Sequence, residues 1–261
     1  MTSAAVGFQC PECVAAGRKE TRSGQAAYGG ERSTNPMLTS IVLIVVNVLV
    51  WLAIQATGTT GPVQQALALL PQSTRWTPTL EVVGVSGGAW WQVLTSAFVH
   101  MDVLHLAMNM VALYLLGPAV EQVVGRVRFL AIYLVSALTG SAAVMLLGEP
   151  MVQTLGASGA IWGILAALLV IAIRHKGDTR QLWILIGLNV AITVWGMAFI
   201  SWQAHLGGFV GGLLATGVLA FAPREQRGRW QVAGLLAITA LAVVLIVVRA
   251  ISLSVDYSMM L

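Results

Sequence analysis

Seven stretches of apolar residues, most of them long enough to cross a lipid bilayer, dominate this chain. A transmembrane helix needs about 20 apolar residues to span the ~30 Å hydrocarbon core. The stretches run over 37–55, 103–117, 129–147, 156–173, 182–202, 204–222 and 230–248. Hydrophobic residues make up 57% of the chain and charged residues only 9%, which excludes an ordinary soluble domain. The sequence therefore predicts an all-α membrane protein with seven transmembrane helices.

The basic residues predict how these helices are oriented. Lys and Arg collect at the cytoplasmic flanks of transmembrane helices. Twelve of the fourteen basic residues precede the first stretch or lie in the second, fourth and sixth connections: Arg18, Lys19, Arg22, Arg32, Arg126, Arg128, Arg174, Lys176, Arg180, Arg224, Arg227 and Arg229. Only Arg75 and Arg249 fall on the other side. We therefore expect a plasma-membrane protein with a cytoplasmic N-terminus and an external C-terminus, whose even-numbered helices run inward from the outer face.

Polar residues that are unusual in a membrane fall at the outer ends of the even-numbered helices. His100, His105 and Asn109 belong to the second helix, Ser158 to the fourth and His205 to the sixth. Lipid cannot satisfy such groups, so they need partners. Ser158 lies near a helix N-terminus, which favours negative charge, and His105 and Asn109 share one helical face. A nucleophile, a base and convergent donors favour acyl transfer.

Several motifs together resemble those of the rhomboid intramembrane serine proteases. The resemblance covers about 37–222 and extends through the seventh helix. The nucleophile motif corresponds to Gly156-Ala157-Ser158-Gly159, and the base motif to Ala204-His205-Leu206-Gly207-Gly208. Two further sets match in spacing: His100, His105 and Asn109 in the second helix, and Glu121, Gly125, Arg126 and Phe129 at the turn into the third. One such motif is weak, but the set in this order is specific.

The resemblance implies a six-helix rhomboid-like bundle over 37–222, preceded by a cytoplasmic tail, 1–36, and followed by a seventh C-terminal transmembrane helix within 223–261. It implies a Ser158–His205 dyad that needs no carboxylate and hydrolyses transmembrane segments of membrane proteins near the outer face. The oxyanion donors would be the Ser158 backbone N–H, His105 and Asn109. Supporting positions would be His100, Gly156, Gly159, Trp162 and Gly208. Transmembrane substrates and the lipid bilayer are the implied partners; no cofactor and no nucleic acid is implied.

Glycines and two departures from the family pattern refine this expectation. Three small-xxx-small pairs predict close helix packing around the dyad: Gly159 with Gly163, Gly207 with Gly211, and Gly208 with Gly212. Trp162 stands where many members have a tyrosine that stacks on the base, so we expect similar packing with different hydrogen bonding. Gln92 stands where the family often has arginine, which puts the stability of the first external connection in question.

The connections carry further expectations. The long connection 57–89 is rich in Gly and Pro, and Trp76, Trp90 and Trp91 can settle at the lipid interface. The connection before the sixth helix, about 201–203, is expected to be very short. In the family, the fifth helix and the loop after it are associated with substrate entry. Here that region contains Trp195, Met197, Phe199 and Trp202.

The N-terminal tail contains the pair Cys10 and Cys13, which has the spacing of half a zinc site. Zinc normally takes four ligands, and the chain has no other cysteine. The pair resembles the last part of a cysteine-rich cytoplasmic knuckle found in actinobacterial rhomboids. A reduced pair without metal is the preferred interpretation, and zinc shared between two chains is the alternative. Gly24, Gly29 and Gly30 predict a flexible lead into the first helix.

Two other classes of function fit parts of the pattern. A non-proteolytic rhomboid-like protein would bind transmembrane helices, but such relatives generally lack the serine or the histidine. A solute carrier would use the histidines in a proton path, but it would need polar residues toward the cytoplasmic face. Taken singly, Ser158 also fits a helix cap, a buried histidine fits packing, and His100 fits structural hydrogen bonding.

Overall fold

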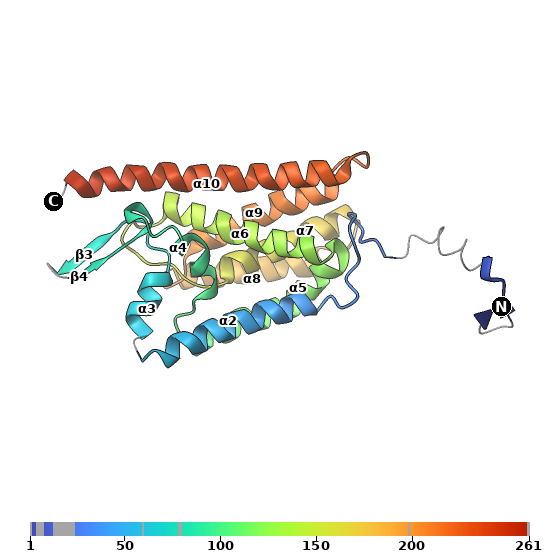
Figure 1. Ribbon diagram of the computed structural model, residues 1–261, viewed down its shortest axis with the longest axis horizontal. Helices are drawn as coiled ribbons and strands as arrows, with labels where there is room; N and C mark the ends of the chain where they lie inside the picture. The colour runs from blue at the N-terminus through green and yellow to red at the C-terminus, as the bar shows by residue number, and fades with distance from the viewer. Residues whose placement is uncertain are drawn as a thin grey trace.

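The computed structural model describes residues 2–3, 8–12, 24–58, 60–77, 80–197 and 199–259. Figure 1 shows a bundle of long helices, with the short elements of residues 60–95 gathered near one end. The helices are α2 Leu38–Ala56, α3 Thr60–Leu67, α4 Gln92–Thr95, α5 Val103–Val124, α6 Arg126–Leu147, α7 Ser158–Arg174, α8 Arg180–Trp195, α9 Trp202–Phe221 and α10 Arg227–Met259, with 3-10 turns η1 Val85–Gly87 and η2 Ser96–Phe98. Two antiparallel pairs of short strands accompany them: β1 Thr2–Ser3 with β2 Phe8–Gln9, and β3 Thr74–Thr77 with β4 Leu80–Val82.

The helical membrane fold expected from the sequence is confirmed. In the part of the chain described, five helices are long and apolar enough to cross a membrane: α2, α5, α6, α9 and α10. The helices α7 and α8 are apolar but shorter, with 17 and 16 residues. The chain is therefore a multi-pass membrane protein, while the number of seven crossings stays a prediction. The four short strands were not predicted.

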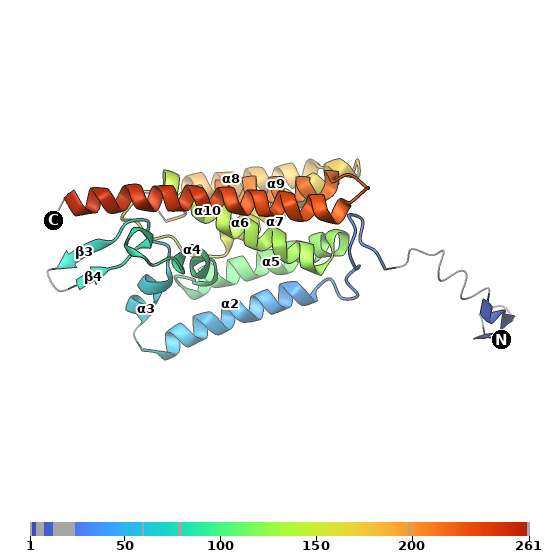
Figure 2. The same cartoon turned by 45° about the horizontal axis from the view of Figure 1, so that its top comes forward.

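Helices α6, α7 and α9 form the centre of the bundle. They enclose a core that includes Phe129, Ile132, Tyr133, Ile164 and Leu219, all at most 1% exposed. Within the most apolar 18 residues of each helix, 56% are buried in α6 and 50% in α9, against 28% in α2 and 17% in α10. In Figures 1 and 2, α10 runs along the bundle beside α9 and α6, and α2 flanks a different side next to α5. The outer helices therefore leave apolar faces for lipid.

Three helix boundaries differ from the sequence prediction. Helix α5 continues beyond 117 to Val124, through Pro118, because its last turns pack against α6 and α7 in the core. Helix α8 ends at Trp195, where the N–H of Gly196 bonds the carbonyl of Ile192, so the connection to α9 runs over 196–201 and is not confined to 201–203. Helix α10 extends to Met259. The apolar residues after Gly196 have the composition of a helix, which explains the wrong boundary.

The N-terminal segment from Gly24 onward folds back onto the bundle. The N–H of Ala27 donates to the Val123 carbonyl at 3.0 Å, and the Gln231 side chain donates to the Tyr28 carbonyl at 2.9 Å. Tyr28 is buried. The prediction of a flexible lead is therefore wrong for this segment, because tertiary contacts hold its glycine-rich turn.

The predicted cysteine pair is only partly described. Cys10 is exposed, and Cys13 lies outside the described residues. Over the ranges that the structure describes, no group of three His, Cys, Asp or Glu side chains is placed to hold a metal ion.

The long connection after α2 is held together by Gln92. This side chain is fully buried at the start of α4. Its Oε1 accepts from the Leu70 N–H at 3.0 Å, and its Nε2 donates to the Val83 carbonyl at 2.9 Å. Trp91 adds a hydrogen bond from its indole to the Ala66 carbonyl at 2.8 Å. Glutamine thus supplies both a donor and an acceptor to the connection.

Replacing Gln92 with leucine should destabilise this connection. The change leaves the buried Leu70 N–H without a partner, at a cost of about 1–3 kcal/mol, and removes the bond to the carbonyl of Val83, a residue that is 42% exposed. We expect a lower thermal midpoint in detergent and faster hydrogen exchange over residues 66–85. The exposed Gln122→Leu variant, at the other end of the bundle, is the control. Equal exchange in the two variants would show that Gln92 does not stabilise the connection.

Candidate functional site

Ser158 is the first residue of α7, and the loop before it ends at the fully buried Ala157. The loop is fixed by a backbone bridge between Thr154 and Leu69 and by a bond from the Gly156 N–H to the Ser96 carbonyl at 2.9 Å. Gly156 has φ of +123°, which favours glycine. A Cβ at this position would lie 2.7 Å from His105 Nε2. The backbone can therefore approach the His105 ring this closely only because residue 156 has no side chain.

Ser158 and His205 meet across α7 and α9. The distance between Ser158 Oγ and His205 Nε2 is 2.9 Å. His205 is 9% exposed, and its ring stacks on that of Trp162 with centroids 5.2 Å apart and an interplanar angle of 28°. Phe209 meets Trp162 edge to face at 5.9 Å. The indole thus packs against the imidazole one turn after Ser158.

The other nitrogen of His205 contacts Thr193, a residue that sequence reasoning missed. Thr193 Oγ1 lies 2.9 Å from His205 Nδ1 and 2.8 Å from the Asn189 carbonyl on its own helix, α8. A hydroxyl has one hydrogen, and the carbonyl can only accept it. Thr193 therefore accepts from Nδ1–H, and Nε2 is left without a hydrogen to face Ser158. The one signal in the sequence is a threonine four residues after an asparagine within an apolar helix.

Glycines set the separation of the two helices that carry Ser158 and His205. A Cβ on Gly208 would overlap the carbonyl oxygen of Gly159, and a Cβ on Gly212 would overlap that of Gly163. On the other face of α9, a Cβ on Gly207 or Gly211 would collide with Thr139 of α6. The predicted pair Gly159 and Gly163 on α7 therefore faces the pair Gly208 and Gly212 on α9 in backbone contact, while the third pair faces α6.

The residues predicted beside the dyad lie around the start of α5. Asp102 caps this helix by accepting from the His105 N–H at 2.8 Å. Asn109 donates one amide hydrogen to the His105 carbonyl at 3.0 Å, which leaves its second amide hydrogen for another acceptor. The rings of His100 and His105 meet edge to face at 5.1 Å. His105 thereby lies next to both His100 and the loop at Gly156.

His100 lies before α5 and is fully buried. Burial, and secondarily the neighbouring His105, lower the pKa of His100 to about 4. Its ring is therefore neutral at pH 7, with Nε2 3.5 Å from the Ala157 N–H. This contact favours support of the loop that carries Ser158.

An open cavity of about 700 Å³ lies at this end of the bundle. Its walls include His105, the loop residues Gln153 and Leu155, Met197 and Phe199 from the connection between α8 and α9, and Trp202 at the start of α9. Phe199 is 86% exposed. A cavity large enough to hold water therefore reaches the residues next to Ser158 and His205, and apolar side chains line its rim.

Comparison with known proteins places these motifs in one family. The Rhomboid domain model matches residues 87–222. Rhomboid protease GluP of Bacillus subtilis is 34% identical over 166 residues, 61% of this chain and 32% of GluP. Putative rhomboid protease YdcA of the same organism is 32% identical over 153 residues, 56% of this chain and 74% of YdcA. RHOMBOID-like protein 5 of Arabidopsis thaliana is 29% identical over 177 residues, 62% of this chain and 55% of that protein.

The aligned part thus spans about a third of GluP and about half of the Arabidopsis relative. The actinobacterial resemblance of the tail stays a prediction, because these relatives come from Bacillus and a plant. The matched region holds Ser158, His205 and the glycines between their helices. The chain belongs to the rhomboid family.

Proposed function

We propose that this chain is an intramembrane serine endopeptidase that cleaves transmembrane segments of membrane proteins. The observation that carries the proposal is the 2.9 Å contact between Ser158 Oγ and His205 Nε2. A capping role for Ser158 is disfavoured, because the N-cap of α7 is Ala157 and no side chain caps the helix. A relative that only binds helices would not need this contact.

The geometry supports a two-step hydrolysis. His205 Nε2 takes the proton of Ser158 as Oγ attacks the substrate carbonyl, and it then gives this proton to the leaving amine. Water next attacks the ester on Ser158 while His205 Nε2 removes a proton from the water. His205 then returns this proton to Ser158 Oγ as the acid product leaves, which restores the hydroxyl. Both steps need Nε2 to begin without a hydrogen, which is the state that Thr193 favours.

The negative charge on the attacked carbonyl oxygen requires donors. The Ser158 N–H belongs to the first turn of α7, where backbone donors lack partners within the helix. His105 lies against Gly156, two residues before Ser158, and Asn109 keeps one amide hydrogen unused by its own helix. In comparable sites one such donor contributes about 3 kcal/mol to the transition state.

The length of α7 supports cleavage just inside the outer membrane boundary. Its 17 residues rise about 26 Å, less than the ~30 Å of hydrocarbon. With Arg174 at the cytoplasmic boundary, Ser158 would lie a few ångströms below the outer one. The alternating helices bring Arg32, Arg126, Arg128, Arg174, Lys176, Arg180, Arg224, Arg227 and Arg229 to the opposite end, which supports a cytoplasmic N-terminus and an external C-terminus.

Within this function, Thr193 is a positioning residue for His205. Thr193→Val keeps the volume but removes the acceptor of Nδ1–H, so we expect kcat to fall about 10- to 100-fold with little change in KM. Thr193→Ser retains the hydroxyl and should restore most of kcat. Thr216→Val, which removes another buried threonine hydroxyl from α9, is the control. An unchanged kcat in Thr193→Val would contradict this role.

The function is tested by labelling the purified full chain with a fluorophosphonate and mapping the adduct by mass spectrometry. An activated serine forms a stable phosphonyl ester, so we expect modification at Ser158 alone. A non-proteolytic binder of helices or a solute carrier should not react. Absence of an adduct at Ser158 in folded protein would reject the serine mechanism.

A further inference from the structure

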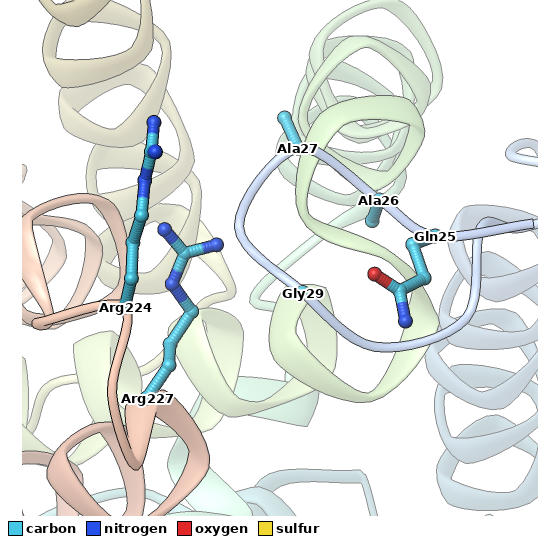
Figure 3. A pocket seen from close by; sticks show the side chains of 6 residues that line it. All are labelled: Gln25, Ala26, Ala27, Gly29, Arg224 and Arg227. Atoms are coloured by element: carbon cyan, nitrogen blue, oxygen red, sulfur yellow. The ribbon is translucent and has the colours of Figure 1, made fainter. Parts of the chain in front are cut away.

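A second cavity of about 700 Å³ lies at the end of the bundle opposite Ser158. Figure 3 shows its two walls: the loop from Gln25 to Gly29 on one side, and the side chains of Arg224 and Arg227 on the other. The arginines come from the turn between α9 and α10 and from the first residue of α10. Two arginines therefore lie across the cavity from a loop that contributes no acid to the lining.

The loop wall is fixed in place. It is closed by hydrogen bonds from the Ala26 N–H to the Gly30 carbonyl at 3.0 Å and from the Gly29 N–H to the Ala26 carbonyl at 2.9 Å. The bonds of Ala27 and Tyr28 to the bundle hold it from behind. The cavity is thus bounded by ordered backbone on one side and by the start of a long helix on the other.

Neither arginine of this cavity forms an ion pair with a described residue, although Glu225 lies between them in the sequence. Among the described residues, the one ion pair joins Arg126 to Glu121. Arg227 Nε is buried without a hydrogen-bond partner. A third guanidinium is close, since a Cβ on Gly29 would lie 3.5 Å from Arg227 Cδ and 3.6 Å from a terminal nitrogen of Arg128. Arg128 uses two of its five N–H donors on Gln231, at 2.8 and 3.0 Å, and it does not line the cavity, so the guanidinium groups that a ligand there would meet are those of Arg224 and Arg227.

We propose that Arg224 and Arg227 bind an anionic phosphate group in this cavity. Guanidinium groups offer paired N–H donors that match phosphate oxygens, and the N-terminus of the 33-residue α10 adds the positive end of the helix dipole beside them. Arginines that serve only to orient the helices would keep their guanidinium nitrogens in water, whereas Arg227 Nε is shielded.

Two sources can supply this chemistry. Trp230 is 57% exposed one turn into α10, as is typical of a side chain at a membrane interface, and this places the cavity at the level of lipid headgroups. An anionic phospholipid of the cytoplasmic leaflet would reach the site from the membrane side. A soluble phosphate compound would reach it from the aqueous side. Both present the same phosphate oxygens to the two arginines.

The test uses the full chain in detergent after removal of copurified lipid. Binding of dioctanoyl phosphatidylglycerol is followed by native mass spectrometry, with dioctanoyl phosphatidylcholine and sodium phosphate as the other probes. In Arg224→Gln/Arg227→Gln we expect phosphatidylglycerol affinity to fall about 100-fold. Arg180→Gln removes an exposed basic residue at the same end of the bundle, outside the cavity, and should bind normally.

Each outcome decides the proposal. A lipid headgroup is supported if the double variant loses phosphatidylglycerol binding, Arg180→Gln keeps it, and millimolar phosphate does not displace the lipid from the wild type. Displacement by phosphate, or phosphate binding that depends on the two arginines, supports a soluble ligand. Equal binding by the wild type and the double variant, or an equal loss in Arg180→Gln, would overturn the site in favour of diffuse basic charge. If the double variant does not fold, Arg224→Lys/Arg227→Lys replaces it. Lysine keeps the charge but loses the paired N–H donors, so phosphatidylglycerol binding should weaken about tenfold. Unchanged binding in this variant would overturn the site.

Discussion

Under the proposed function, replacing Ser158 with alanine is expected to abolish proteolysis while leaving the protein folded and inserted. In the proposed mechanism the hydroxyl forms the ester, and it lies 2.9 Å from the nitrogen that would accept its proton. Removing a serine nucleophile typically lowers kcat by about 10⁶-fold, so cleavage should fall below detection. The measurement is cleavage of a membrane reporter whose transmembrane segment contains small, helix-breaking residues. Fluorophosphonate labelling should disappear in parallel.

A matched serine variant separates loss of chemistry from loss of structure. Ser136 lies in α6, is fully buried, and has an Oγ without a hydrogen-bond partner. Ser136→Ala therefore removes a hydroxyl of the same size from the core of the bundle and should cleave the reporter at the wild-type rate. Product formation by Ser158→Ala at a rate comparable with that of Ser136→Ala would reject the proposed mechanism.

The sequence predicted the parts of the site that follow from helix order. A lipid bilayer requires long apolar helices. Because successive helices alternate in direction, the starts of the fourth and the sixth predicted helices lie at the same level in the membrane. Ser158 and His205 were therefore placed together without coordinates. The glycines were predicted for the same reason, since helices that must approach closely need small residues at the contact.

Other features depend on contacts that no local pattern encodes. Thr193 looks like any threonine that bonds the carbonyl four residues earlier in its helix, and only the packing of α8 against His205 reveals its second partner. The segment around Tyr28 has a turn-rich composition, and its docking depends on Gln231, more than 200 residues away. The cavity of Arg224 and Arg227 exists because of that docking, so it was not predictable either.

The second large effect is expected at Gly208, which lies one turn after His205. A Cβ at this position would overlap the Gly159 carbonyl oxygen, which is backbone and cannot rotate away. Gly208→Ala should therefore push α9 from α7 and lengthen the separation of Ser158 Oγ and His205 Nε2 beyond hydrogen-bond range. A misplacement of about 1 Å typically costs about 100-fold in rate, so we expect at least that loss in kcat/KM for reporter cleavage.

Gly217 provides a control in the same helix. An added Cβ there meets nothing within 4 Å, so Gly217→Ala should keep full activity and gain slightly in helix stability. Thermal unfolding in detergent should show that both variants fold, and the rate of fluorophosphonate labelling then reports the dyad directly. Slow labelling in Gly208→Ala with normal labelling in Gly217→Ala would tie the rate to the separation of the two helices. Equal labelling would mean that the dyad tolerates a wider spacing, and that the glycine contact serves packing without setting the reactive geometry.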